Sequence, residues 1–330
     1  MSASAPDSGN GAGNGNKVSK PPRLLRHARV THRRVRRLPP VVRGMVWTML
    51  SGVLFCMLNA LLRKMTLVMD PLQAQFLRYL FGVLVMLPLI LRLGFAAFRP
   101  NNVRGQFTRG AVHALALGLW FIALPHMSLP DVTSIGFTTP IFVMIGAAIV
   151  FGEKMRWDRW LAAGLGFAGI MLVVGPRMAG SGGMYTLVML ASAPAFAASF
   201  LITKALTRYE SAPTIVLWQA VTVAALTLPF ALPHWQWPQL SQWLIFFTCG
   251  LLGSTGHYCL TRAFACADIS ATQSVKFLDL VWASILGWLM FADQPSQWTI
   301  LGGSVICGST LWIARREAAR RKAATLAGAA

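Results

Sequence analysis

The sequence predicts an all-α, polytopic membrane protein of ten transmembrane helices, built as two inverted five-helix repeats. Of its 330 residues, 55% are hydrophobic and only 12% are charged, whereas a soluble domain carries about 25% charged residues. Apolar runs of about 20 residues recur along the chain, which is the length that crosses a bilayer as a helix. Part of the chain also returns as a degraded copy about 140 residues later, which indicates an internal duplication.

The duplication is clearest in the stretch from Ser128 to Gly175. There an apolar helix, a charged turn from Phe151 to Lys154 and a second apolar helix follow one another. After the turn, the second copy is shorter by two residues. The aligned pairs are Ala123 with Ala263, Phe137 with Phe277, Phe151 with Phe291, Glu153 with Asp293, Trp160 with Trp298, and Gly164 with Gly302.

Residues 1–43 form a basic tail that we expect to be disordered, because it is rich in Ser, Gly, Asn and Arg and has no apolar face. A second basic tail covers 315–330. Between the tails, the first repeat occupies 44–175 and the second 176–314. The ten expected spans are 44–62, 71–91, 108–126, 129–151, 158–175, 184–203, 213–232, 240–261, 268–291 and 297–314.

The connections between these spans are short and contain residues that end or begin helices. Asp70-Pro71 opens the second span, Leu129-Pro130-Asp131 the fourth, and Ser211-Ala212-Pro213 the seventh. Further breaks fall at Gly175-Pro176, Pro233 and Asp293-Gln294-Pro295.

The basic residues predict that both termini are cytoplasmic, in the inner (cytoplasmic) membrane. Lys and Arg stay on the cytoplasmic side of membrane proteins, and an even number of spans puts both tails on one side. With the tails inside, three Lys or Arg fall in outer connections (Arg63, Lys64, Arg177). Ten fall in inner ones: Arg92, Arg99, Arg104, Arg109, Lys154, Arg156, Arg159, Lys204, Arg208 and Arg262.

This topology makes the two repeats inverted. The Glu153 turn joins spans four and five and faces in, whereas its counterpart at Asp293 joins spans nine and ten and faces out. Five spans per copy is an odd number, so the second copy enters the membrane upside down. Inverted repeats are typical of secondary transporters, which bind substrate near the membrane midplane between the halves.

The chain resembles the ten-helix, EamA-type members of the drug/metabolite transporter superfamily over about residues 44–314. The resemblance implies a carrier for small metabolites. In the second copy, Ala292-Asp293 replaces the family's usual Gly-Glu. The matching residues are Gln75-Phe76-Leu77-Arg78-Tyr79, Arg109-Gly110, Phe151-Gly152-Glu153 with Trp160, and Gly287 with Phe291-Ala292-Asp293-Gln294-Pro295.

Lys276 and Asp279 are ionisable residues inside the ninth span. A charge in an apolar span costs roughly 2.5–3.5 kcal/mol on insertion scales and therefore needs a reason. Three residues apart, the two side chains share one face of a continuous helix. Either they neutralise each other within the bundle, or they form a substrate or proton site facing a central cavity. The string from Lys276 to Asp279 also resembles one in relatives regarded as carriers for uptake of S-adenosylmethionine or other metabolites.

Four further residues are candidates for the substrate or proton pathway. Arg78 either has a structural role or binds an anionic substrate group through its two-pronged guanidinium. His113 and Trp120 are seven residues apart and share a helix face; Trp120 either packs or stacks on a planar or cationic substrate. His113 is either a hydrogen-bonded packing residue or a proton relay, and Gln75 is a polar candidate. Polar residues with the same open interpretation are Asn59, Thr133, Thr138, Thr139, Gln273, His126 and His257.

Several other patterns argue against enzymatic chemistry. The GxGxxG string from Gly164 to Gly169 lies in an apolar span, where small residues permit close helix packing, and lacks the strand that a nucleotide site needs. No Walker A, HExxH or GxSxG motif is present, so we expect no enzyme, no metal and no cofactor. The five cysteines show no CxxC spacing and are interpreted as packing residues.

The leading hypothesis is a carrier of a small organic metabolite that works by alternating access. One alternative is a flippase for a lipid-linked intermediate, which requires a groove open to the bilayer. Another is a non-transporting membrane subunit that docks partners through its basic tail. The expected partners are a small-molecule substrate and the bilayer, with anionic lipid headgroups rather than nucleic acid at the basic tails, in a monomer or homodimer.

Overall fold

The computed structural model describes residues 39–136, 138–153, 183–276 and 278–292, with isolated positions between 157 and 171 and between 297 and 312. All regular structure within these ranges is helical. The basic tails, most of the expected spans 158–175 and 297–314, and Asp293 lie outside the described residues.

Among the described residues, six helices are long and apolar enough to cross a membrane. They are α2 (Pro40–Thr66), α3 (Pro71–Leu93), α4 (Val103–Ala123, continued by the 3-10 turn η2, Leu124–His126), α8 (Gly183–Leu206), α9 (Ala212–Ala231) and α10 (Leu240–Cys266). A further 3-10 turn, η1, covers Phe95–Phe98.

Helix α2 begins earlier than the sequence analysis expected, inside the predicted tail 1–43. Its first residue is Pro40, and proline suits the first helical position because its missing N–H would have no intrahelical partner there. Helix α10 likewise continues to Cys266, five residues beyond the end expected for that span.

The span 129–151 is covered by α5 (Leu129–Gly136) and α6 (Thr138–Phe151), the described helices on either side of position 137. The span 268–291 consists of α11 (Ile269–Lys276) and α12 (Asp279–Phe291), and Leu278 lies in a turn between them. The prediction of one continuous helix across 268–291 is therefore wrong. Apolar composition alone does not reveal this break, because α11 and α12 still lie in one hydrophobic stretch.

Side-chain caps explain where several helices begin. The Asp70 carboxylate accepts hydrogen bonds from the N–H groups of Leu72 and Gln73, both at 2.9 Å, at the start of α3. At the start of α9, the Ser211 hydroxyl accepts from Thr214 N–H at 3.3 Å. These caps satisfy N–H groups that have no partner within the helix.

Helices α6 and α12 are followed by residues in the left-handed backbone region. Gly152 has φ 63°, and Ala292 has φ 55°. Among the described residues, Ala292 is the only non-glycine residue with positive φ. Glycine adopts this conformation without strain, whereas alanine does so at a cost.

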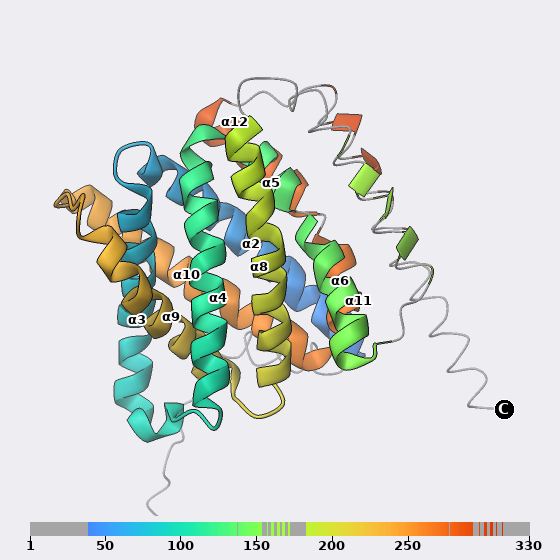
Figure 1. Cartoon of the computed structure of the whole chain (residues 1–330), viewed down its shortest axis with the longest axis horizontal. Helices are drawn as coiled ribbons and strands as arrows, with labels where there is room; N and C mark the ends of the chain where they lie inside the picture. The colour runs from blue at the N-terminus through green and yellow to red at the C-terminus, as the bar shows by residue number, and fades with distance from the viewer. Residues whose placement is uncertain are drawn as a thin grey trace, which may run out of the picture. The chain divides into compact units, whose positions relative to one another are not determined.

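The long helices pack in pairs: α2 lies along α10, α4 along α8, and α3 against both α9 and α10 (Figure 1). Helix α4 also contacts α9. The short helices cross between these pairs, with α6 against α8 and α11, and α12 against α2 and α5.

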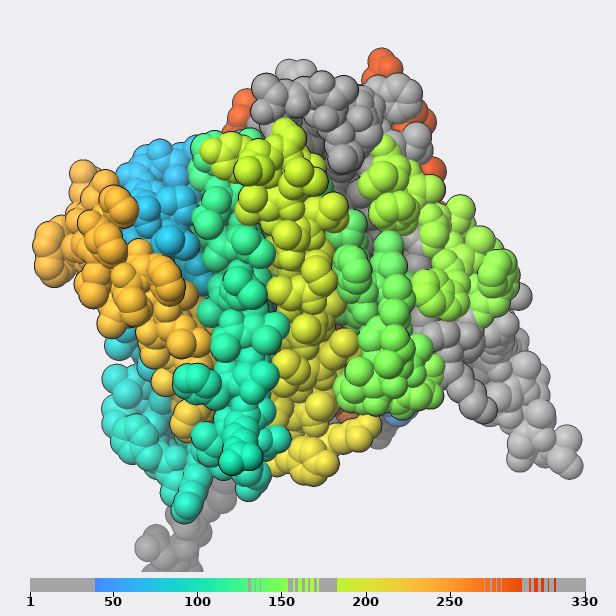
Figure 2. Space-filling model, viewed as in Figure 1, coloured from blue at the N-terminus to red at the C-terminus, as the bar shows by residue number. Residues whose placement is uncertain are grey.

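The outer surface of this bundle is apolar. Figure 2 shows α4, α8 and α6 side by side on one face of the molecule. Each carries exposed apolar side chains, for example Leu115 on α4, Leu187 on α8 and Ile149 on α6. Such a surface suits contact with lipid, in which every backbone polar group must be satisfied within the helices.

Candidate functional site

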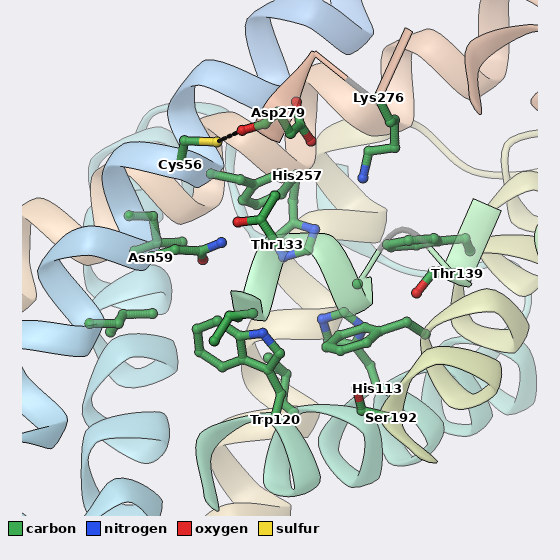
Figure 3. Close-up of a pocket in the computed structure, with 18 of the residues that line it drawn as sticks. Cys56, Asn59, His113, Trp120, Thr133, Thr139, Ser192, His257, Lys276 and Asp279 are labelled. Carbon is green, nitrogen blue, oxygen red and sulfur yellow. Dashed lines mark hydrogen bonds between the residues drawn. The ribbon is translucent and has the colours of Figure 1, made fainter. Parts of the chain in front are cut away.

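A cavity of about 170 Å³ lies inside the bundle. Its walls come from α2, α3, α4, α5 and α6 of the first half of the chain and from α8, α10, α11 and α12 of the second half (Figure 3). Gly136 and Thr139 contribute from the span 129–151, and Lys276 and Asp279 contribute from either side of the break between α11 and α12.

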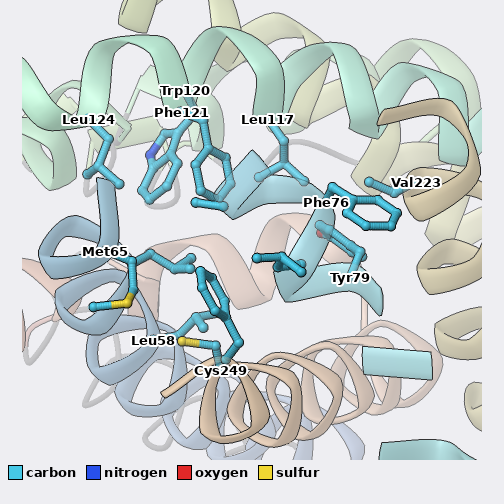
Figure 4. Packing of buried hydrophobic residues seen from close by; sticks show 14 of the residues in the cluster. Leu58, Met65, Phe76, Tyr79, Leu117, Trp120, Phe121, Leu124, Val223 and Cys249 are labelled. Carbon is cyan, nitrogen blue, oxygen red and sulfur yellow. The ribbon is translucent and has the colours of Figure 1, made fainter. Parts of the chain in front are cut away.

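The walls of the cavity are rich in aromatic rings: Phe55, Tyr79, Trp120, Phe196 and Phe200 all line it. The rings of Phe196 and Phe200 are stacked, with centroids 6.2 Å apart and planes at 27°. Trp120 and Tyr79 are held by the apolar cluster in Figure 4, where Trp120 meets Phe121 edge-on at 5.1 Å. Fixed rings of this kind form flat walls for a planar molecule.

Lys276 and Asp279 lie on either side of the break between α11 and α12. Lys276 ends α11 and Asp279 begins α12, so each charge lies at the helix end whose dipole favours it. The sequence analysis placed both on one face of a continuous helix, which is wrong because the helix stops between them. Lys276 points into the cavity, with Nζ 5.2 Å from the Phe200 ring centroid (Figure 3).

The Asp279 carboxylate lies directly against helix α2. A methyl group built on Gly52 would overlap this carboxylate, with Cγ only 3.0 Å away. One turn further along α2, the Cys56 thiol donates to the backbone carbonyl of Asp279, with 3.4 Å between sulfur and oxygen. The structure records no direct ion pair between the side chains of Lys276 and Asp279, both of which are described.

Two histidines connect the cavity wall to a buried hydrogen-bond network. His113 Nε2 lies 3.0 Å from the Tyr79 hydroxyl, and His113 Nδ1 lies 3.0 Å from the Ser199 hydroxyl. The Gln219 amide donates to the Tyr79 hydroxyl at 3.4 Å and lies 3.3 Å from His257 Nε2. Both histidines line the cavity, and the network fixes their rings.

Arg109 anchors the far end of this network. The sequence analysis counted Arg109 among the inner-loop cations, but its side chain is 2% exposed inside α4. Its guanidinium donates to the Thr203 hydroxyl at 2.5 Å, to the Ile215 carbonyl at 3.1 Å and to the Gln219 side-chain oxygen at 2.6 Å. Arg109 therefore fastens α4 to α8 and α9 and does not line the cavity.

The structure brings together five of the six candidate residues, since Asp279, Lys276, Arg78, Trp120 and His113 all line the cavity. The sixth, Gln75, lies at the interface of α3 and α4, outside the lining, where its amide donates to the Ala114 carbonyl at 3.2 Å. His126 also lies outside the lining and stacks on Tyr185 at 3.7 Å. The other predicted polar residues that line the cavity are Asn59, Thr133, Thr139, Gln273 and His257.

The sequence analysis did not predict that five further residues line the cavity. Four are aromatic (Phe55, Tyr79, Phe196 and Phe200), and the fifth is Ser192. Phenylalanine on an apolar helix faces lipid or a cavity equally well, so helical spacing carries no signal that separates the two. Among the described residues, no group of His, Cys, Asp and Glu is arranged to hold a metal ion.

A bundle of apolar helices around a cavity, with charged residues where one of the spans is interrupted, defines the class of multi-pass membrane carriers. The chain belongs to the EamA-like transporter family, whose model matches it twice, over residues 42–175 and 183–315. The family resemblance seen in the sequence is thereby confirmed.

Individual relatives match nearly the whole chain. It is 33% identical over 287 residues to a riboflavin transporter of Rhizobium johnstonii, covering 84% of this chain and 93% of the relative. It is 25% identical over 280 residues to an S-adenosylmethionine uptake transporter of Rickettsia prowazekii, covering 85% and 95%. A solved structure titled "Crystal structure of protein" has the same fold, with a TM-score of 0.69 at 18% identity over 83% of this chain and 98% of that one.

Proposed function

We propose that this protein is a secondary carrier that moves a flat, heteroaromatic metabolite across the cytoplasmic membrane by alternating access, and that riboflavin is the first substrate to test. The observation that carries the proposal is the cavity, whose walls are aromatic rings and whose edges are the polar groups of Asn59, Thr133 and Gln273. Rings hold a planar molecule by stacking, and a few polar groups at the edge set its orientation.

The names of the relatives support this substrate class. One is named for riboflavin, which has a fused three-ring system, and another for S-adenosylmethionine, which carries an adenine ring. The cavity is smaller than the roughly 300–1,000 Å³ typical of sites for drug-sized ligands. In our proposal, the two halves therefore separate to admit a vitamin-sized substrate and close again around it.

The proposed architecture is ten helices in two inverted units, 44–175 and 176–314, with cytoplasmic termini. The helix contacts support it, because contacts between the two units have counterparts in which the equivalent helices have exchanged units. Helix α2 contacts α10, and the equivalent helices α8 and α4 also contact each other. In the same way, α6 contacts α11, and the equivalent helices α12 and α5 contact each other. The matched left-handed residues, Gly152 and Ala292, support the same alignment.

Within this architecture, Asp279 and Lys276 form the substrate or proton site. They occur in one unit only, since the alignment pairs them with Thr139 and Gly136 of the other unit. In our proposal, this asymmetry gives the pseudosymmetric cavity one charged wall. The charged wall orients the bound substrate, and its carboxylate, Asp279, exchanges a proton during the transport cycle.

The proposal is tested with purified protein in proteoliposomes loaded with or without riboflavin. A carrier for riboflavin shows saturable flux above protein-free vesicles, and an excess of unlabelled riboflavin on the opposite side accelerates it by counterflow. If riboflavin moves no faster than in protein-free vesicles while S-adenosylmethionine does, the substrate assignment is wrong. If a fluorescent lipid analogue changes leaflet instead, the flippase alternative is correct.

A further inference from the structure

Two of the arginines that the structure describes are buried in the bundle, and their surroundings differ. Arg109 is 2% exposed, and each of its three guanidinium nitrogens donates a hydrogen bond within the protein. Arg78 is 4% exposed and lines the cavity, yet the structure records no hydrogen-bond acceptor for it among the described residues. All three guanidinium nitrogens of Arg109 are therefore used to hold the protein together, whereas no described residue accepts a hydrogen bond from the guanidinium of Arg78.

The surroundings of Arg78 hold its guanidinium in place without neutralising it. Its Cζ lies 3.9 Å from the centroid of the Tyr79 ring, a cation–π contact. On the other side it packs against Gly253 of α10, where an added methyl group would come within 2.9 Å of Cζ. Gly253 thus leaves the space that the guanidinium fills, and Tyr79 covers one of its faces.

Arg78 also borders a second, much smaller cavity of about 10 Å³, which lies between α3, α9 and α10. The polar residues around this small cavity are Tyr79, Gln219, Ser254 and His257, and none of its described lining residues is a carboxylate. It has room for about one water molecule. A water bound there would solvate the guanidinium but would supply no negative charge.

The charges around the main cavity do not balance. Among its described lining residues, Arg78 and Lys276 are cationic and Asp279 is the only carboxylate. An isolated charge buried in an apolar protein is strongly unfavourable, and a bound counterion removes that penalty. A guanidinium also presents parallel N–H groups that match the two oxygens of a carboxylate or phosphate.

We infer that Arg78 forms an anion-binding subsite at the α3 side of the cavity, which takes an acidic group of the carried metabolite, a carboxylate or a phosphate monoester. This rests on the proposed function in that the aromatic walls hold the ring system of the same molecule. It adds that the preferred substrate is an anionic derivative rather than the neutral ring compound.

The test uses two matched pairs of ligands that differ in one acidic group. Flavin mononucleotide is compared with riboflavin, and indole-3-acetate with indole-3-acetamide, by calorimetric titration of the purified full-length protein. We expect the anionic member of at least one pair to bind about 10- to 100-fold more tightly, the range that charge-assisted hydrogen bonds provide. Discrimination by the flavin pair alone identifies a phosphate, and discrimination by the indole pair alone a carboxylate.

Four variants assign the preference to one residue. Arg78→Gln is expected to abolish the difference within each pair, and Arg78→Lys to reduce it, because an ammonium lacks the two-pronged geometry. Arg92→Gln is the matched control, since it removes an exposed arginine from the same helix and is expected to keep the difference. Lys276→Gln tests the other cation of the cavity.

Equal affinities within both pairs in the unmodified protein would overturn the inference. So would a preference that survives in Arg78→Gln and disappears in Lys276→Gln. If neither flavin binds but indole-3-acetate still binds more tightly than its amide through Arg78, the subsite stands and riboflavin is the wrong substrate class.

Discussion

The contact between Gly52 and Asp279 gives the sharpest prediction, because it fixes the position of the only carboxylate described in the cavity wall. Replacing Gly52 by alanine places a methyl group where the carboxylate now lies, with Asp279 Cγ at 3.0 Å. Either the carboxylate rotates away or α2 and α12 move apart. Overpacking of this size costs about 1–3 kcal/mol, which exceeds the gain of up to about 1 kcal/mol that alanine brings to a helix interior.

Gly52→Ala should therefore lower both the thermal stability of the purified protein and its transport rate. Gly118→Ala is the matched control, because its nearest atom, Gln75 Oε1, is 4.0 Å away and the methyl group has room. In an Asp279→Ala background the collision partner is absent, so Gly52→Ala should then be neutral or stabilising. An equal penalty for Gly52→Ala in both backgrounds would refute the placement of the carboxylate against α2.

Substitutions at four other positions test separate parts of the account. Asp279→Asn should abolish transport with the amount of protein in the membrane unchanged on immunoblots; full transport would remove Asp279 from the mechanism. Arg109→Ala breaks three buried hydrogen bonds and should destabilise the protein by about 2–4 kcal/mol in denaturant titrations, whereas a loss of transport at unchanged stability would contradict a structural role. Ala292→Gly should stabilise by about 1 kcal/mol, since glycine adopts the left-handed conformation freely; a lower melting temperature would count against that strain. Trp120→Ala should weaken riboflavin binding about tenfold, whereas Trp120→Phe should retain most of the affinity. Equal affinities of the two variants would show that the Trp120 ring only packs against its neighbours and does not stack on the substrate.

Hydrophobicity predicted the membrane-crossing part of the fold well. All six long helices lie within a few residues of the expected spans, because about 20 apolar residues have few alternatives to a transmembrane helix. The break between α11 and α12 was not predicted. The apolar residues on both sides of it suit a helix, so hydrophobicity gives no sign of the interruption.

The cavity was predicted in part for a similar reason. A charged or large polar side chain in an apolar span is expensive, which correctly singled out Lys276, Asp279 and Arg78. Cost alone does not separate a residue that faces the cavity from one that packs between helices. Gln75 and Arg109 belong to the second kind, and only their partners on neighbouring helices show it.

The central claim is that two inverted units enclose the cavity, and it is tested most directly by labelling from each side of the membrane. Single cysteines replace Trp157 and Gln297, the first exposed described residues after the two matched turns, in a cysteine-free background. A membrane-impermeant thiol reagent should label position 297 in intact cells and position 157 only in inside-out vesicles. Labelling of both positions from the same side would contradict the inverted architecture and, with it, the proposed alternating-access mechanism.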